Sequence, residues 1–181
     1  MENIKDIVFK FQGSPHYWRE KAKELRYAAE ILWPYSETRM NKIMTSIKEN
    51  NDIDILSIEP DTFNTFLALI GFSTECLFKG TIIRDNPSFV SNGKLSSKLA
   101  THDLHKLASL AKIKLSTNEQ IFCNQALEAM TVKFRYPISK VAEDAKTDLI
   151  MGEHCKTVFT DLFDRLYPTL GQIIANGRLI R

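Results

Sequence analysis

The stretch that most constrains the fold is residues 63–84, which is nearly apolar all round when it is wound as a helix. It begins after Pro60-Asp61-Thr62 and ends before Asn86-Pro87. A helix without a polar face is stable in water only when other elements cover it, so the sequence predicts a central, buried helix. Gly71 in its interior costs about 1 kcal/mol relative to alanine, and we expect a neighbouring helix to approach closely there.

Two helices are predicted before this segment. Ser14-Pro15 supplies an N-cap and a proline at the first helical position, and Pro34 is expected to stop the helix that follows. A second helix is expected at about 37–48. Its predicted inward residues are Met40, Ile43, Met44 and Ile47.

Three helices are predicted after it. Thr101 is the expected N-cap of the first, with Asp103 in its first turn, where the helix dipole favours an anion. Ser116 and Glu119 match a capping box for the second, which ends before Pro137. The last is expected at about 148–176, broken or kinked by Pro168.

The remaining segments are predicted to be peripheral. Residues 1–13 are interpreted as a short strand or an arm, residues 52–57 as an extended piece, and residues 85–100 as a mobile polar loop. The whole chain, 1–181, is predicted to be one all-α domain with its core at about 15–176. Its expected architecture is an up-and-down bundle of four to five core helices with peripheral N- and C-terminal elements.

Composition narrows the class of protein. The net charge is only +2 over 181 residues, so the chain as a whole does not predict nucleic-acid binding. The three isolated cysteines favour buried thiols in a reducing compartment over a disulfide framework. We expect no signal peptide, no membrane span and a cytoplasmic location. Motifs for phosphate loops, dinucleotides and serine nucleophiles are absent from the sequence, and we expect no cofactor.

Two histidines open the helix after residue 100. His102 and His105 are three residues apart and share a face, a spacing that is compatible with a weak metal site. Because no third ligand stands at a recognisable spacing, we expect no metal. The simpler interpretation is that His102 caps the helix or hydrogen-bonds to a neighbour, while His105 is solvated.

A charged pair interrupts the apolar helix. Glu75 and Lys79 are four residues apart, so their side chains meet on one face. If the pair is buried it needs further partners, which His102 or Arg135 are placed to supply. The pair is therefore either part of a structural polar network or part of a ligand site.

Two groups of basic residues can each be interpreted as structural or as ligand-binding. Arg135 precedes Tyr136-Pro137 at the end of a helix, where arginine suits the dipole and proline stops the helix. Alternatively, Arg135 grips a phosphate and Tyr136 stacks on a base. Arg19, Lys23 and Arg26 are either a solvated helix face or an RNA-facing strip.

These motifs together resemble the HEPN superfamily of small helical domains. The resemblance lies in residues 71–80, in Thr101-His102-Asp103 with Leu107, and in Arg135-Tyr136-Pro137, and it spans about residues 60–140. It implies a helical bundle and a dimer packed through its helices. By the same resemblance, Glu75, Lys79, His102, Asp103, Arg135 and Tyr136 form a polar ligand-binding cluster.

Many members of that family are metal-independent endoribonucleases that carry an arginine and a histidine with four to six residues between them. No histidine of this chain has such an arginine, and the nearest match is Lys98 before His105. Lysine lacks the planar fork that grips phosphate. We therefore expect a non-catalytic domain, not an enzyme, that binds a nucleotide, RNA or a partner protein.

The context and two alternative functions remain open on the sequence. The resemblance implies a context of phage defence or toxin–antitoxin systems and a partner such as a nucleotidyltransferase. A divergent endoribonuclease would need the catalytic candidates His102 and Arg135 to converge on one phosphate. A purely structural helical interaction module would instead show an exposed apolar patch.

Overall fold

The computed structural model describes residues 4–49, 61–91, 93–133 and 152–171, with the short segments 173–175 and 178–180. Over these ranges the chain is an all-α bundle, as the sequence predicts. The α-helices are α1 (Ile4–Gln12), α2 (Pro15–Lys48), α3 (Phe63–Asp85), α4 (Leu104–Leu110), α5 (Thr117–Glu128) and α6 (Gly152–Leu166). The π-helix η4 (Ala129–Lys133) follows α5, and the 3-10 turns are η2 (Pro87–Phe89), η3 (Ser97–Leu99) and η6 (Tyr167–Gly171).

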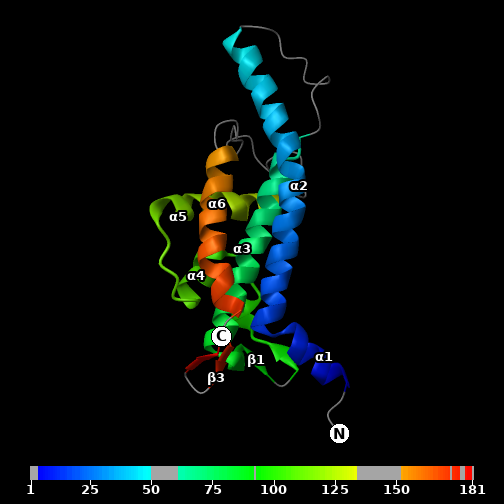
Figure 1. The fold of residues 1–181 in the computed structure, drawn as a ribbon, viewed down its shortest axis with the longest axis vertical. Coiled ribbons are helices and arrows are strands. Elements are labelled where there is room, and N and C mark those ends of the chain that lie inside the picture. The colour runs from blue at the N-terminus through cyan, green and yellow to red at the C-terminus, as the bar shows by residue number, and fades with distance from the viewer. Residues whose placement is uncertain are drawn as a thin grey trace.

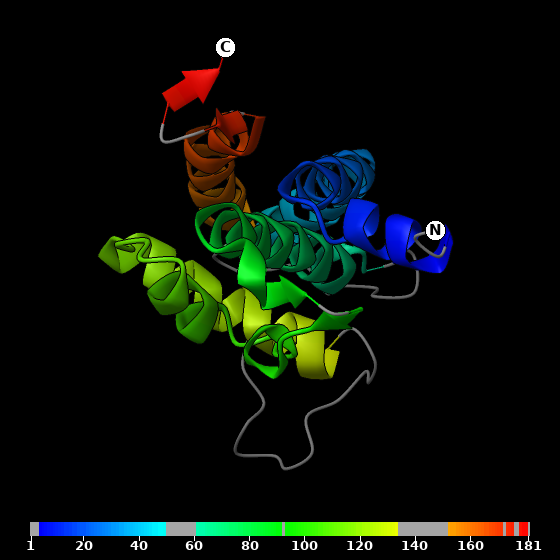
Figure 2. The same ribbon diagram turned by 90° about the horizontal axis from the view of Figure 1, so that it is seen from below.

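Three long helices define the long axis of the molecule. Figure 1 shows α2, α3 and α6 side by side, with α3 and α6 running opposite to α2. Seen from below in Figure 2, these three helices appear end-on, while α5 and η4 cross the bundle beside α3. Helix α1 and the two small antiparallel ladders, β1 (Val90–Ser91) with β2 (Lys94–Leu95) and β3 (Ile173–Ala175) with β4 (Arg178–Ile180), lie at one end.

Helix α3 is the central helix that its composition predicts. From Phe66 to Ile83 nearly every residue is buried. At Gly71 a Cβ would stand 3.1 Å from the Cβ of Ala126 and closer still to Met130, which confirms the predicted close approach of another helix. In the described parts of the chain, α3 is also the one helix with the length and apolar composition of a membrane span. Of its most apolar window, 89% is buried inside the bundle.

Helix α2 does not stop at Pro34, so the prediction of two separate helices is wrong. The helix continues from Pro15 to Lys48. A proline in a helix interior removes one hydrogen bond and crowds the preceding turn. Tertiary contacts on either side of the proline offset that cost, because Trp33 and Ser36 are both buried and the Ser36 hydroxyl lies 2.7 Å from the Thr62 hydroxyl.

The end of α2 also differs from the prediction. Met44 and Ile47 were expected to face inward, but they are 36% and 49% exposed. Figure 1 shows the reason, since the last turns of α2 project beyond the ends of α3 and α6. No described element covers these turns, so a correct helical periodicity there does not lead to burial.

The two ends of the chain were partly mispredicted. Residues 4–12 form the short helix α1, not a strand, because Ile4, Ile7, Val8 and Phe11 recur at helical spacing. At the other end, Pro168 ends the α-helical geometry as expected, but the chain then forms η6 and the ladder of β3 with β4 where a helix to residue 176 was predicted. The segment 52–57 lies outside the described residues.

The caps and connections explain where the helices begin. Ser14 accepts a hydrogen bond from the Tyr17 amide, and Ser116 and Glu119 form the predicted capping box. The polar segment 85–100 contains η2, η3 and a hairpin that pairs Val90 with Leu95. All three cysteines are buried and free, as the sequence predicts.

Candidate functional site

A buried ion pair lies in the middle of α3. Lys79 Nζ is 2.6 Å from Glu75 Oε1, and the two side chains are only 7% and 9% exposed. The pair is one helical turn apart, as the sequence predicts. Removing two charges from water is costly, and their mutual attraction offsets this cost only when further hydrogen bonds satisfy the remaining atoms. The second carboxylate oxygen of Glu75 is therefore the atom that needs a partner.

His102 is that partner. Its Nδ1 lies 2.8 Å from Glu75 Oε2, across 27 residues of sequence. An ionised carboxylate only accepts hydrogen bonds, so Nδ1 carries the hydrogen and donates it. This confirms the prediction that a buried Glu75–Lys79 pair recruits a further group. We call Glu75, Lys79 and His102 the polar triad.

The imidazole of His102 is held in place and half exposed. Its side chain is 55% exposed, and its ring meets the ring of Phe72 edge-on at 6.0 Å between centroids. With Nδ1 directed at Glu75, the opposite edge of the ring carries Nε2. A ring oriented in this way can donate a hydrogen bond to a phosphate when protonated, or exchange a proton when neutral.

An aromatic ring lies on the other side of the ion pair. Lys79 Nζ lies 5.7 Å from the ring centroid of Trp18 on α2. That distance is within the range at which an ammonium group is attracted to an aromatic face. Lys79 is thus in contact with both Glu75 and Trp18, and α2 helps to fix this member of the triad.

Asp103 has a structural role next to the triad. It is the N-cap of α4, where its carboxylate accepts from the Lys106 amide at 3.0 Å. This backbone hydrogen bond lowers the pKa of the carboxyl, and the ammonium of Lys106 3.0 Å away adds to the effect. The predicted cap, Thr101, is wrong for α4, because its hydroxyl instead accepts from the Asp103 amide at 3.1 Å. The N-cap of α4 is therefore Asp103, two residues after the predicted cap Thr101.

The other predicted residues are distributed as follows. His105 Nε2 lies 2.7 Å from Asn124 Oδ1, so it is tied to α5 and not merely solvated. Arg135 and Tyr136 lie outside the described residues. The prediction that Arg135 and His102 converge therefore stays untested. The structure thus brings Glu75, Lys79 and His102 together.

Two arginines of the basic strip on α2 pack against α6 and the first residue of η6. The Arg19 guanidinium lies 4.2 Å from the Tyr167 ring centroid, and that of Arg26 lies 4.5 Å from the Phe163 ring centroid. Arg26 also bonds Asp164 at 2.8 Å. These contacts join two helices that are far apart in sequence. Sequence reasoning missed these contacts because each arginine and its aromatic partner are far apart in the chain.

Metal binding finds no support within the described ranges, where no group of three His, Cys, Asp or Glu side chains is arranged to hold an ion. Comparison with known proteins gives no match to a family model, to a curated protein or to a solved structure. Function is therefore inferred from the residues of this chain.

Proposed function

We propose that this protein is a non-catalytic helical domain that binds the phosphate of a nucleotide or of RNA at His102. The observation that supports this is the 2.8 Å hydrogen bond between Glu75 and His102. It fixes the ring through Nδ1, so Nε2 is the ring nitrogen not bonded to Glu75, in a side chain that is half exposed. Because Lys79 already neutralises Glu75, a protonated imidazole presents a net positive charge to an anion.

The resemblance to the HEPN superfamily agrees with this proposal. Members of that family include domains that bind nucleotides and RNA, and the polar triad falls on the motifs that carry the resemblance. The arginine that ribonucleases of the family place before their histidine is missing here. A non-catalytic binding role in the cytoplasm follows, in a phage-defence or toxin–antitoxin setting with a partner such as a nucleotidyltransferase.

A divergent, metal-independent endoribonuclease is the second candidate. The same hydrogen bond motivates it, because a histidine oriented by a carboxylate is also the arrangement of a general acid or base. A purely structural interaction module is the third candidate, motivated by the exposed apolar side chains of α2.

Binding and cleavage of RNA distinguish these candidates. Labelled RNA and AMP are titrated into the wild type, the His102→Ala variant and the His105→Ala variant, and total RNA is incubated with each protein in EDTA and in Mg²⁺. His105 is the matched control because it lies three residues away and bonds Asn124 instead of Glu75. We expect saturable binding that His102→Ala weakens about tenfold, the loss of one charge-assisted hydrogen bond, with no cleavage.

Other outcomes would reverse the ranking. Cleavage in EDTA that only His102→Ala abolishes would identify a ribonuclease. Equal binding by both variants would place the ligand away from the triad. An absence of binding to either probe would favour the interaction module.

We further propose that the protein is a homodimer that pairs through the outer face of α2. Tyr27, Ile31 and Tyr35 follow one another at four-residue spacing and are 67%, 54% and 55% exposed. They form a continuous apolar stripe of the kind that marks a protein–protein contact. We call it the α2 stripe.

Opposite charges lie beyond the two ends of the α2 stripe. Glu20 lies eleven residues before Ile31 and Lys42 lies eleven residues after it. Eleven residues make about three helical turns, so both charges share the face of Ile31. Two antiparallel copies of α2 centred on Ile31 would therefore bring each glutamate next to the lysine of the other copy, as a two-fold interface requires.

A further inference from the structure

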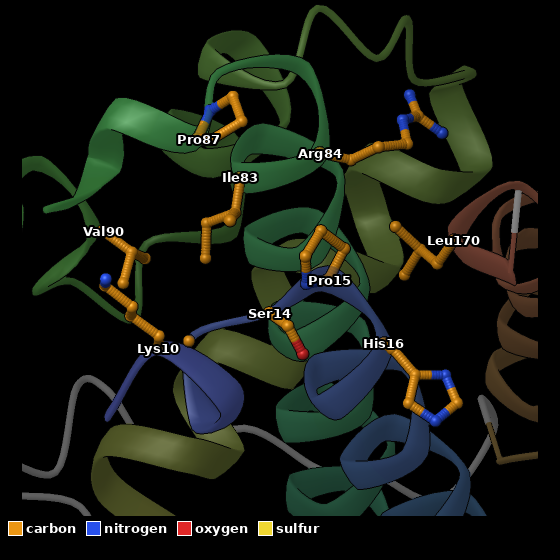
Figure 3. A pocket seen from close by; sticks show the side chains of 10 residues that line it. Lys10, Ser14, Pro15, His16, Ile83, Arg84, Pro87, Val90 and Leu170 are labelled. Atoms are coloured by element: carbon orange, nitrogen blue, oxygen red, sulfur yellow. The ribbon is translucent and has the colours of Figure 1, made fainter. Parts of the chain in front are cut away.

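A cavity of about 380 Å³ lies at the end of the bundle away from the protruding tip of α2. It is open to solvent and is bordered by the corner between α1 and α2, by the end of α3, and by η2, β1 and η6 (Figure 3). Sites for small molecules are typically concave spaces of roughly 300–1,000 Å³ with mostly apolar walls. By size, this cavity is at the lower end of that range.

The walls of the cavity are mostly apolar. Ile83, Val90 and Leu170 come from three structural elements, α3, β1 and η6, and Pro15 and Pro87 complete the surface. Figure 3 shows Ile83, Pro15 and Leu170 around its centre. A Cβ on Gly13 would lie 2.4 Å from Val90 Cγ1, so the backbone itself closes this wall. Such a surface suits the hydrocarbon part of a ligand.

The rim of the cavity is basic. Of the described residues that line it, Lys10, His16 and Arg84 can carry positive charge, and none is acidic. Figure 3 shows Lys10 at the side of Val90, while His16 and Arg84 lie towards Leu170. Arg84 forms an ion pair with the Asp85 carboxylate at 2.7 Å, which offsets part of its charge, and donates to the Thr169 carbonyl at 3.3 Å. Two of its five N–H groups are used in this way, and the guanidinium is fixed at the rim.

We infer that this cavity binds a small amphipathic acid, a molecule with a short hydrocarbon body and one carboxylate. The hydrocarbon is buried against Ile83, Val90 and Leu170, and the carboxylate is paired at the basic rim. Ile83 lies eight residues beyond Glu75 on α3, or about 12 Å along the helix. The cavity is therefore a second site, and it does not depend on the phosphate-binding role proposed for His102.

Calorimetric titration of the full-length protein with octanoate tests this inference. Octylamine and octanol serve as matched probes with a positive head and a neutral head, and AMP is the competitor that reports on a nucleotide. Lys10→Gln removes one rim charge, and Lys5→Gln on the same helix is the control outside the cavity. Pro15→Trp fills the cavity at a helical position that tolerates most residues, and circular dichroism checks that this variant is folded.

We expect octanoate to bind at one site. It should bind at least about tenfold more tightly than octanol or octylamine, because neither of these probes can form the charge-assisted hydrogen bond of the carboxylate. Lys10→Gln should weaken octanoate several-fold, Pro15→Trp should abolish its binding, and Lys5→Gln should leave it unchanged. Equal binding of all three probes would overturn the acid specificity. Binding that survives in folded Pro15→Trp protein, displacement by AMP, or no saturable binding of octanoate would each overturn the assignment.

Discussion

Trp33 on α2 packs its ring against Phe66 on α3, with centroids 4.9 Å apart and planes inclined at 52°. Both side chains are almost completely buried. Aromatic pairs in this tilted arrangement contribute about 0.5–1.5 kcal/mol beyond the burial of their area. The contact comes one residue before Pro34, so the two longest helices are fastened together at the point where α2 is intrinsically weakest.

Phe66→Ala should lower the free energy of unfolding by about 3–5 kcal/mol, since the substitution leaves a cavity next to Trp33 that the bundle refills only in part. Chemical denaturation measures the change. Ile121→Ala on α5 is the control, because Ile121 is 39% exposed and should cost less than about 1 kcal/mol. A cost below about 1 kcal/mol at Phe66 would contradict the assigned orientation of α3.

Local signals in the sequence were enough to place α3 and several helix starts. An apolar run that is bounded by prolines predicts a buried helix whatever packs around it, and the bonds of Ser14 and Ser116 involve residues only three positions away. Wrong predictions arose where distant residues decide the outcome. The helix passes through Pro34 because of contacts to Phe66 and Thr62, which no local pattern contains.

In the candidate site, too, local contacts could be predicted from the sequence and distant contacts could not. The spacing of Glu75 and Lys79 predicts their pairing, since four residues make one helical turn. His102 joins this pair because the chain after η3 passes beside α3. In the sequence, only the resemblance to a family and the need of a buried ion pair for further partners indicated His102. The cavity beside Gly13 gave no signal in the sequence, because its walls come from three distant stretches of the chain, 10–16, 83–90 and Leu170.

Glu75→Gln should destabilise the protein by about 3–5 kcal/mol, because it leaves the ammonium of Lys79 buried without its counter-charge. Thermal or chemical unfolding measures this. The double variant Glu75→Gln, Lys79→Met should recover much of the loss, as apolar replacements of buried ion pairs do. Lys106→Gln, which removes an exposed ion pair with Asp103, is the control and should cost at most about 1 kcal/mol. An equal effect of Glu75→Gln and of the control would show that the pair is not buried in solution.

The N-cap of α4 should make stability depend on pH. Bonds from Lys106 lower the folded-state pKa of Asp103 below its unfolded value of about 3.9, so the ionised carboxylate stabilises the folded state. This contribution is fully present above about pH 4 and is lost as the pH falls through the folded-state value. Asp103→Asn should therefore be less stable than the wild type at pH 7, and the difference should shrink in acid. Denaturation curves between pH 7 and pH 2.5 test this, and a difference that does not change with pH would contradict it.

The α2 stripe predicts the effect of a charge at its centre. Ile31→Glu would bury two like charges face to face at the proposed two-fold axis, so the dimer should dissociate at least about a hundredfold more readily. Sedimentation velocity over a range of concentrations measures this, with Ile121→Glu on α5 as the control at another exposed isoleucine.

The charged ends of the stripe give a sharper test of its geometry. Lys42→Glu should weaken the dimer, because it faces Glu20 of the other copy when the helices are antiparallel. Adding Glu20→Lys in the same chain exchanges the two charges and should restore the dimer. A wild type that is monomeric at all concentrations would contradict the interface. If Ile31→Glu disrupts the dimer but the charge exchange does not restore it, the two helices pair in another register.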